Sequence, residues 1–98
     1  MIHHSVYFKF KIGLSTLETQ DFFKAANLLS AIPGVQNFEV VKEISPKNDF
    51  EFGLSMVFEN AKVYENYNLH PHHVSFVQEY WLQMVEDFLE IDYEAIVG

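Results

Sequence analysis

The chain has 98 residues, a formal net charge of -8 and a hydrophobic share of 49%. This length allows one domain with its own core, and the apolar content excludes disorder as the main state. All six basic residues are lysines, so the arginines that favour nucleic acid, phosphate or anionic membrane surfaces are absent. The lack of cysteine excludes disulfides, thiol catalysis and cysteine-based metal sites.

The N-terminal residues do not follow the pattern of a signal peptide, and no apolar run is long enough to span a bilayer. We therefore expect a cytoplasmic protein made of one domain, residues 1–98, with no nucleic-acid or membrane partner.

The first half of the chain predicts a strand followed by a helix. Residues 2–12 alternate between apolar and polar side chains, which is typical of a strand with one apolar face. Ser15 and Glu18 have the spacing of a capping box, and the helix that they begin is expected to end at Pro33. The apolar face of the strand carries Ile2, His4, Val6, Phe8, Phe10 and Ile12.

Residues 35–45 and 49–58 predict two further strands, joined closely enough to form a hairpin. Turn-forming residues that begin with Pro46 separate them. The second strand of the pair has a wholly apolar face, made of Phe50, Phe52, Leu54, Met56 and Phe58.

The last third of the chain predicts two helices and a closing strand. Asn60 is placed to cap a short helix over 61–69, and Pro71 suits the first turn of a second helix over 72–86. Residues 87–94 are expected to form the final strand. The second helix has one apolar stripe, made of His73, Val77, Trp81, Met84 and Phe88.

This order, β-α-β-β-α-β, is the ferredoxin-like arrangement of the α+β class. It predicts a four-stranded antiparallel sheet with helices on one face. The other face then carries Tyr7, Val41, Val57 and Ile91 among polar residues. Because monomers rarely expose such a surface, we expect a homodimer formed through the helix-free face of the sheet.

The histidines are the strongest indication of chemistry. Three of the five fall within four residues, shortly after Tyr67, and His4 lies on the apolar face of the first strand. Helices covering that face would bring His4 and His73 together, where an imidazole can act as general acid or base. Tyr67 could bond that imidazole or a substrate oxygen. The alternative is a hydrogen-bonded core without chemistry, in which His70 only caps the following helix.

A metal site is a second interpretation of the same histidines. They lack the helical pair spaced by four residues that zinc proteases use, and no cysteine is available. Two histidines and one carboxylate would require an acidic side chain on the same interior, where none is expected. Asp92 is the one acid excepted from this expectation, because it lies between the apolar residues Ile91 and Tyr93. We therefore expect neither a metal nor a cofactor.

Four segments share the pattern of one known family. Three of them are residues 2–11, a strand that includes His4; residues 32–39, which begin with Ile-Pro-Gly-Val; and the closing residues 91–93. The most specific is 67–73, Tyr-Asn-Leu-His-Pro-His-His, which matches a Tyr-x-x-His-Pro-x-His signature. Together they resemble the stress-responsive dimeric A/B barrel domain family over nearly the whole chain.

The resemblance implies a ferredoxin-like fold that dimerises sheet against sheet into an α+β barrel, with a pocket inside each subunit. In members similar to plant polyketide cyclases, the signature tyrosine and the last histidine act together. They match Tyr67 and His73, and the strand-one histidine matches His4. The histidine would remove a proton alpha to a carbonyl while the tyrosine holds the oxygen, without cofactor or metal. The residues expected to line the pocket are Val6, Phe8, Phe22, Leu54, His70, Trp81 and Met84.

We therefore expect a small homodimer with an apolar pocket for a small carbonyl or aromatic compound, in a stress-related or undefined role. The sequence leaves open a cofactor-free cyclase or lyase with His73 as base, a ligand carrier, and a structural dimer whose pocket is filled by phenylalanines. A monooxygenase on the related barrel fold is a further alternative. The fold match does not decide whether the protein is an enzyme.

Overall fold

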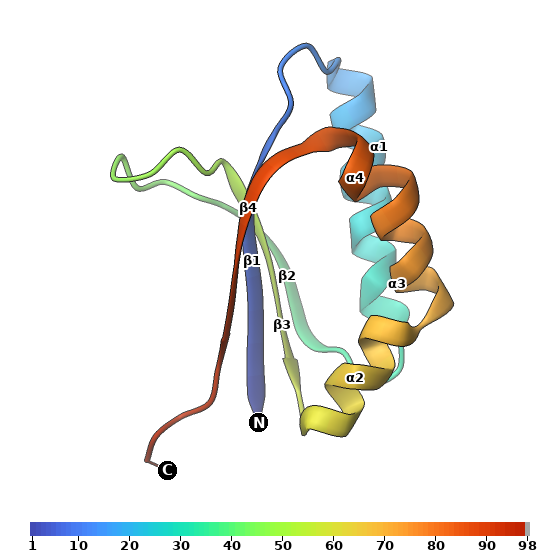
Figure 1. The fold of residues 1–98 in the computed structure, drawn as a ribbon, viewed down its shortest axis with the longest axis vertical. Coiled ribbons are helices and arrows are strands. Elements are labelled where there is room, and N and C mark those ends of the chain that lie inside the picture. The colour runs from blue at the N-terminus through green and yellow to red at the C-terminus, as the bar shows by residue number, and fades with distance from the viewer. Residues whose placement is uncertain (98) are drawn as a thin grey trace.

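The computed structural model describes residues 1–97 as one four-stranded antiparallel sheet with helices packed on one face (Figure 1). Across the sheet the strand order is β2-β3-β1-β4. The strands are β1 (Ile2–Phe10), β2 (Gln36–Lys42), β3 (Phe52–Phe58) and β4 (Val85–Tyr93). The helical segments are α1 (Thr16–Leu28), the 3₁₀ turn η1 (Leu29–Ala31), α2 (Ala61–Leu69), α3 (Pro71–Phe76), the π-helix η2 (Val77–Trp81) and α4 (Leu82–Met84). The expected ferredoxin-like fold is confirmed.

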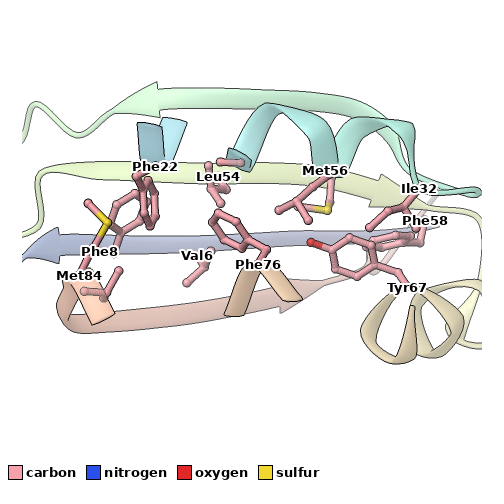
Figure 2. Close-up of a cluster of buried hydrophobic side chains, with 13 residues drawn as sticks. Val6, Phe8, Phe22, Ile32, Leu54, Met56, Phe58, Tyr67, Phe76 and Met84 are labelled. Atoms are coloured by element: carbon pink, nitrogen blue, oxygen red, sulfur yellow. The ribbon is translucent and has the colours of Figure 1, made fainter. Parts of the chain in front are cut away.

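The core lies between the sheet and the helices, and aromatic side chains fill much of it (Figure 2). Phe8, Phe22 and Phe58 have no exposed surface. The ring of Phe22, on α1, lies 5.3 Å from that of Phe8 and 5.3 Å from that of Phe76 on α3. These contacts join both long helical segments to the middle of the sheet, and they leave the opposite face of the sheet without a helix (Figure 1).

The start of α1 follows the predicted capping box. The Ser15 hydroxyl accepts a hydrogen bond from the Glu18 N–H, and the Glu18 carboxylate accepts one from the Ser15 N–H. These bonds satisfy backbone groups that the first turn of a helix leaves unpaired. Asn60 likewise caps α2, as predicted, by accepting a bond from the Val63 N–H.

Several predicted boundaries were wrong. β1 ends at Phe10 rather than at 12, because the Lys11 N–H turns to the Met84 carbonyl, and Ile12 is 96% exposed. β3 begins only at Phe52, and Phe50 lines a hollow on the helix-free face instead of joining the core. β2 is likewise shorter than expected, so Ile44 is exposed beyond its end.

The last helix is also shorter and less regular than predicted. The five residues of η2 form a π-helix, in which the Leu82 N–H donates to the Val77 carbonyl five residues earlier. The helical segment ends at Met84, so Phe88 belongs to β4 and not to the helix. Within residues 1–97, none of the helices combines the length and the apolar character that crossing a membrane requires.

The register of β4 places acidic side chains on the helix side of the sheet. Glu90 lies opposite Val6, whose side chain faces the helices. Since alternate residues of a strand face opposite sides, the helix-side residues of β4 are Phe88, Glu90 and Asp92. The apolar set on the other face is Leu89, Ile91 and Tyr93, each at least 43% exposed. The expectation that no acid faces the interior was therefore wrong, because β4 turns its more apolar side away from the helices.

Candidate functional site

A cavity of about 270 Å³ lies between the sheet and the helices. Its wall is mostly apolar and comes from β1, β3, β4, the η1 turn and the helical segments from α2 to α4. Leu82, Phe88 and Glu90 are the exposed side chains of this wall, so the mouth lies between α4 and β4. Such a space suits a small, largely apolar molecule.

The break between α2 and α3 positions His73. Pro71 begins α3, so α2 ends at Leu69 and the carbonyl groups of its last turn have no partner within the helix. The Nδ1 of His73 lies 3.0 Å from one of them, the Asn68 oxygen. A carbonyl oxygen only accepts hydrogen bonds, so Nδ1 carries the hydrogen and the lone pair of the neutral ring is at Nε2.

The surroundings of His73 favour its neutral form. Burial lowers the pKa of this imidazole, and the nearby His4 ring lowers it further, against the opposing effects of the Asn68 carbonyl and the Glu90 charge. His73 also lines the cavity. An unprotonated imidazole with a free Nε2 on a cavity wall is suited to accept a proton from a ligand.

Tyr67 presents a free hydroxyl beside His73. Its ring is 2% exposed and lies 4.6 Å from the imidazole of His73, centroid to centroid. Figure 2 shows the hydroxyl pointing along the sheet toward Met56 and Phe76, two residues of the cavity wall. The side-chain hydrogen bonds found within residues 1–97 do not include this hydroxyl, and burial raises its pKa. It therefore remains a neutral donor for an oxygen atom in the cavity.

A second imidazole, His4, is held by a hydrogen-bonded network at the same cavity. Its Nδ1 lies 2.6 Å from Asp92 Oδ1, and the Tyr64 hydroxyl donates to Asp92 Oδ2 over 2.9 Å. The Tyr64 oxygen is also 2.8 Å from the His4 Nδ1. Because an ionised carboxylate only accepts, Nδ1 of His4 is the protonated nitrogen. The network fixes the orientation of this ring on the cavity wall.

Glu90 adds a carboxylate at the cavity mouth. Its negative charge contributes, after the larger effect of burial, to the raised pKa of Tyr67. The same charge opposes the lowering of the His73 pKa. The carboxylate is therefore close enough to both groups to influence their charge states.

The π-helix η2 shapes the opposite wall. Its wide turn inserts one residue relative to an α-helix, which rotates the side chains that follow. Val77, Trp81 and Leu82, from this π-helix and the residue after it, all line the cavity. In the part of the chain that the structure describes, no three histidine or acidic side chains come together in a way that could hold a metal ion.

The model of one protein family, described as the stress responsive A/B barrel domain, matches residues 2–95. The chain belongs to this family. Olivetolic acid cyclase of Cannabis sativa is 30% identical over 83 residues, which cover 81% of this chain and 82% of that protein.

Solved structures of similar proteins agree with the fold. A protein of this family from Mesorhizobium loti, with a ferredoxin-like fold, is 47% identical, covers 97% of this chain and 96% of that chain, and has a TM-score of 0.91. A dimeric ferredoxin-like protein of unknown function from Thermobifida fusca has a TM-score of 0.82 over 96% of this chain and 90% of that chain. At 17% identity, this second similarity shows the fold alone.

The structure of this A/B barrel protein brings most of the predicted site residues to one cavity. The predicted residues that line it are His4, Val6, Leu54, Tyr67, His73 and Trp81. Phe8, Phe22 and Met84 lie in the packed core beside it. His70 lies outside the cavity and caps α3, where its Nδ1 accepts a bond from the His72 N–H.

Three groups of the site were not predicted from the sequence: Tyr64, the Asn68 carbonyl and Glu90. Tyr64 lies one helical turn before Tyr67, so the signature tyrosine gave an indirect signal for it. The Asn68 carbonyl belongs to the backbone and carries no sequence signal. Glu90 resembles a solvated acid until the register of β4 is known.

Proposed function

We propose that this protein is a cofactor-free enzyme that removes a proton alpha to a carbonyl group of a small apolar compound. His73 is the base and Tyr67 is the hydrogen-bond donor to the carbonyl oxygen. The observation that carries the proposal is the bond from His73 Nδ1 to the Asn68 carbonyl, which directs the lone pair to Nε2. The free hydroxyl of Tyr67 beside it supplies the second half of the pair.

The chemistry needs only these two side chains. Nε2 of His73 takes the proton from the carbon, and the Tyr67 hydroxyl stabilises the enolate oxygen that forms. The enolate carbon then attacks a second carbonyl of the same molecule, and the protonated His73 returns its proton to the new alkoxide. This intramolecular aldol step agrees with the cyclase name of the Cannabis sativa relative.

Proton abstraction can be tested without knowing the natural substrate. Acetophenone, a small aromatic ketone, exchanges its methyl protons for deuterium in heavy water, and NMR measures the rate. We expect the protein to accelerate this exchange and His73→Gln to reduce the acceleration by about a hundredfold or more, since general-base catalysis commonly contributes that much. Glutamine keeps the size and polarity of the side chain, so calorimetry should still detect acetophenone binding to the variant.

The exchange rate should rise with pH, because His73 acts only when it is unprotonated. Burial lowers the His73 pKa below its ordinary value of 6.5, so the midpoint of the rise should lie below that pH. Binding without accelerated exchange would contradict catalysis and identify a ligand carrier. A His73→Gln variant that keeps the full exchange rate would reject His73 as the base.

The helix-free face of the sheet supports a homodimer. Leu89, Ile91 and Tyr93 are half exposed there, beside a hollow that Tyr7 and Val41 also line. A monomer would leave this apolar surface in water. A second copy that packs the same face against it covers both, which is the isologous arrangement of a two-fold dimer. The Thermobifida fusca protein of the same fold is described as dimeric.

A further inference from the structure

We propose that Glu90 makes the cavity selective for uncharged ligands, so that a neutral carbonyl compound binds and its carboxylate analogue is repelled. This inference rests on the proposed function, because it concerns the ligands of the same cavity. It assigns a specificity-determining role to a residue that takes no part in the proton transfer.

Glu90 lies where a ligand would enter the cavity. It lies on the edge strand β4, opposite Val6 of the cavity wall, and its side chain is exposed at the mouth. Among residues 1–97, no lysine or histidine forms an ion pair with it. Its charge therefore acts on whatever enters.

No lysine or arginine of the described cavity wall offsets this negative charge. None of the six lysines of the chain contributes to the described wall, and the sequence contains no arginine. Asp92, on the same face of β4, adds a second carboxylate behind His4. A ligand carboxylate that enters past Glu90 would therefore be repelled by these negative charges.

The placement of Glu90 contrasts with the rest of β4. The strand turns Leu89, Ile91 and Tyr93 to the face without helices and directs Glu90 toward the cavity. An apolar side chain at this position would extend the apolar wall formed by Val6, Phe88 and their neighbours. The carboxylate instead restricts the charge of the ligand, while the Tyr67 hydroxyl still provides a donor for a neutral carbonyl oxygen.

Two compounds of nearly equal shape can test this selectivity. 4-Acetylbenzamide is neutral, and 4-acetylbenzoate is an anion at about pH 8, where free imidazoles are also uncharged. Calorimetry should show that the wild-type protein binds the amide about tenfold or more tightly than the acid. Glu90→Gln should reduce this ratio to about threefold or less, chiefly by improving binding of the acid.

The change in the ratio, rather than the ratio itself, reports on Glu90, because any carboxylate loses hydration when it enters an apolar cavity. Glu59→Gln is the matched control, since it removes the same charge from an exposed residue that lines no described cavity. This control should keep the wild-type ratio. An unchanged ratio in Glu90→Gln, or equal binding of both compounds by the wild type, would overturn the inference.

The same experiment separates this inference from the proposed function. Selective binding of the amide, together with no acceleration of acetophenone exchange, would reject the enzyme and leave the selectivity of Glu90 intact. Accelerated exchange, together with an unchanged ratio of amide to acid binding in Glu90→Gln, would support the enzyme and reject the selectivity of Glu90. If the wild type binds neither compound, the cavity is not a binding site for such ligands, and the inferred selectivity is rejected as well.

Discussion

Two tyrosines of α2, one turn apart, have hydroxyl groups in different situations. The Tyr64 hydroxyl is bonded to Asp92 and lies beside His4. The Tyr67 hydroxyl has no protein partner among the described residues and faces the cavity. Burial raises the pKa of both, so both are neutral donors near neutral pH. The same functional group thus serves the fold at one position and is available to a ligand at the other.

Phenylalanine substitutions should separate these roles. Tyr64→Phe removes a bond to an ionised carboxylate and should lower the free energy of unfolding by about 1–3 kcal/mol. Tyr67→Phe leaves no partner unsatisfied and should change stability by less than about 0.5 kcal/mol. It should nevertheless reduce the acceleration of acetophenone exchange by about tenfold or more, because the enolate loses its donor. Urea unfolding and NMR exchange measure the two quantities.

Each tyrosine serves as the control for the other, since the same atom is removed from the same helix. Equal losses of stability in Tyr64→Phe and Tyr67→Phe would contradict the conclusion that only the Tyr64 hydroxyl is hydrogen-bonded within the protein. An exchange rate unaffected by Tyr67→Phe would remove this hydroxyl from the proposed chemistry.

Some residues of the site could be predicted because side-chain chemistry and spacing carry them. The position of His4 follows from strand alternation, whereas Tyr67 and His73 match the Tyr-x-x-His-Pro-x-His signature of the family that the sequence resembles. Other features depend on geometry that no local pattern encodes. The tautomer of His73 is set by the backbone oxygen of Asn68, and the role of Glu90 depends on a strand register.

The connection from η1 to β2 depends on Gly34. Its φ of +91° is a left-handed conformation, and a Cβ at this position would overlap the Val63 side chain of α2. Gly13, between β1 and α1, has a similar φ of +94° but open space around it. The two glycines therefore share the conformational requirement and differ in packing.

Alanine at these positions should separate strain from overlap. Gly13→Ala should lower the free energy of unfolding by about 1 kcal/mol, through the left-handed backbone alone. Gly34→Ala should lower it by about 2–4 kcal/mol, because the new methyl group also displaces α2 or Val63. Urea unfolding of the two variants measures the difference. Equal costs would show that α2 adjusts freely and that the close approach has no energetic consequence.

Local signals predicted where the elements lie better than where they end. The caps of α1 and α2 were predictable because Ser15, Glu18 and Asn60 act on backbone groups within three residues. The ends of β1 and of the last helix were not, because the Lys11 N–H and the Met84 carbonyl bond to each other across the fold. The π turn of η2 likewise leaves an apolar stripe that is indistinguishable from that of an α-helix.

For the whole molecule, the proposed dimer interface is the helix-free face of the sheet. Leu89→Lys places a charge in the centre of the proposed interface and should convert the homodimer into a monomer of 11.5 kDa. Leu17→Lys, on the exposed side of α1, is the matched control and should leave the dimer intact. Analytical ultracentrifugation at micromolar concentration distinguishes the two masses. A monomeric wild type, or a dimeric Leu89→Lys variant, would reject the helix-free face as the interface.

The position of Trp81 gives the molecule an internal optical probe. It is the one tryptophan of the chain, and its ring lies on the cavity wall, 5.0 Å from that of Phe8 and 5.5 Å from that of Phe88 at the mouth. A compound that enters the cavity changes the polarity around this indole and so its fluorescence emission. Association through the opposite side of the sheet does not reach it. The fluorescence of Trp81 can therefore report occupancy of the cavity without a dye attached to the protein.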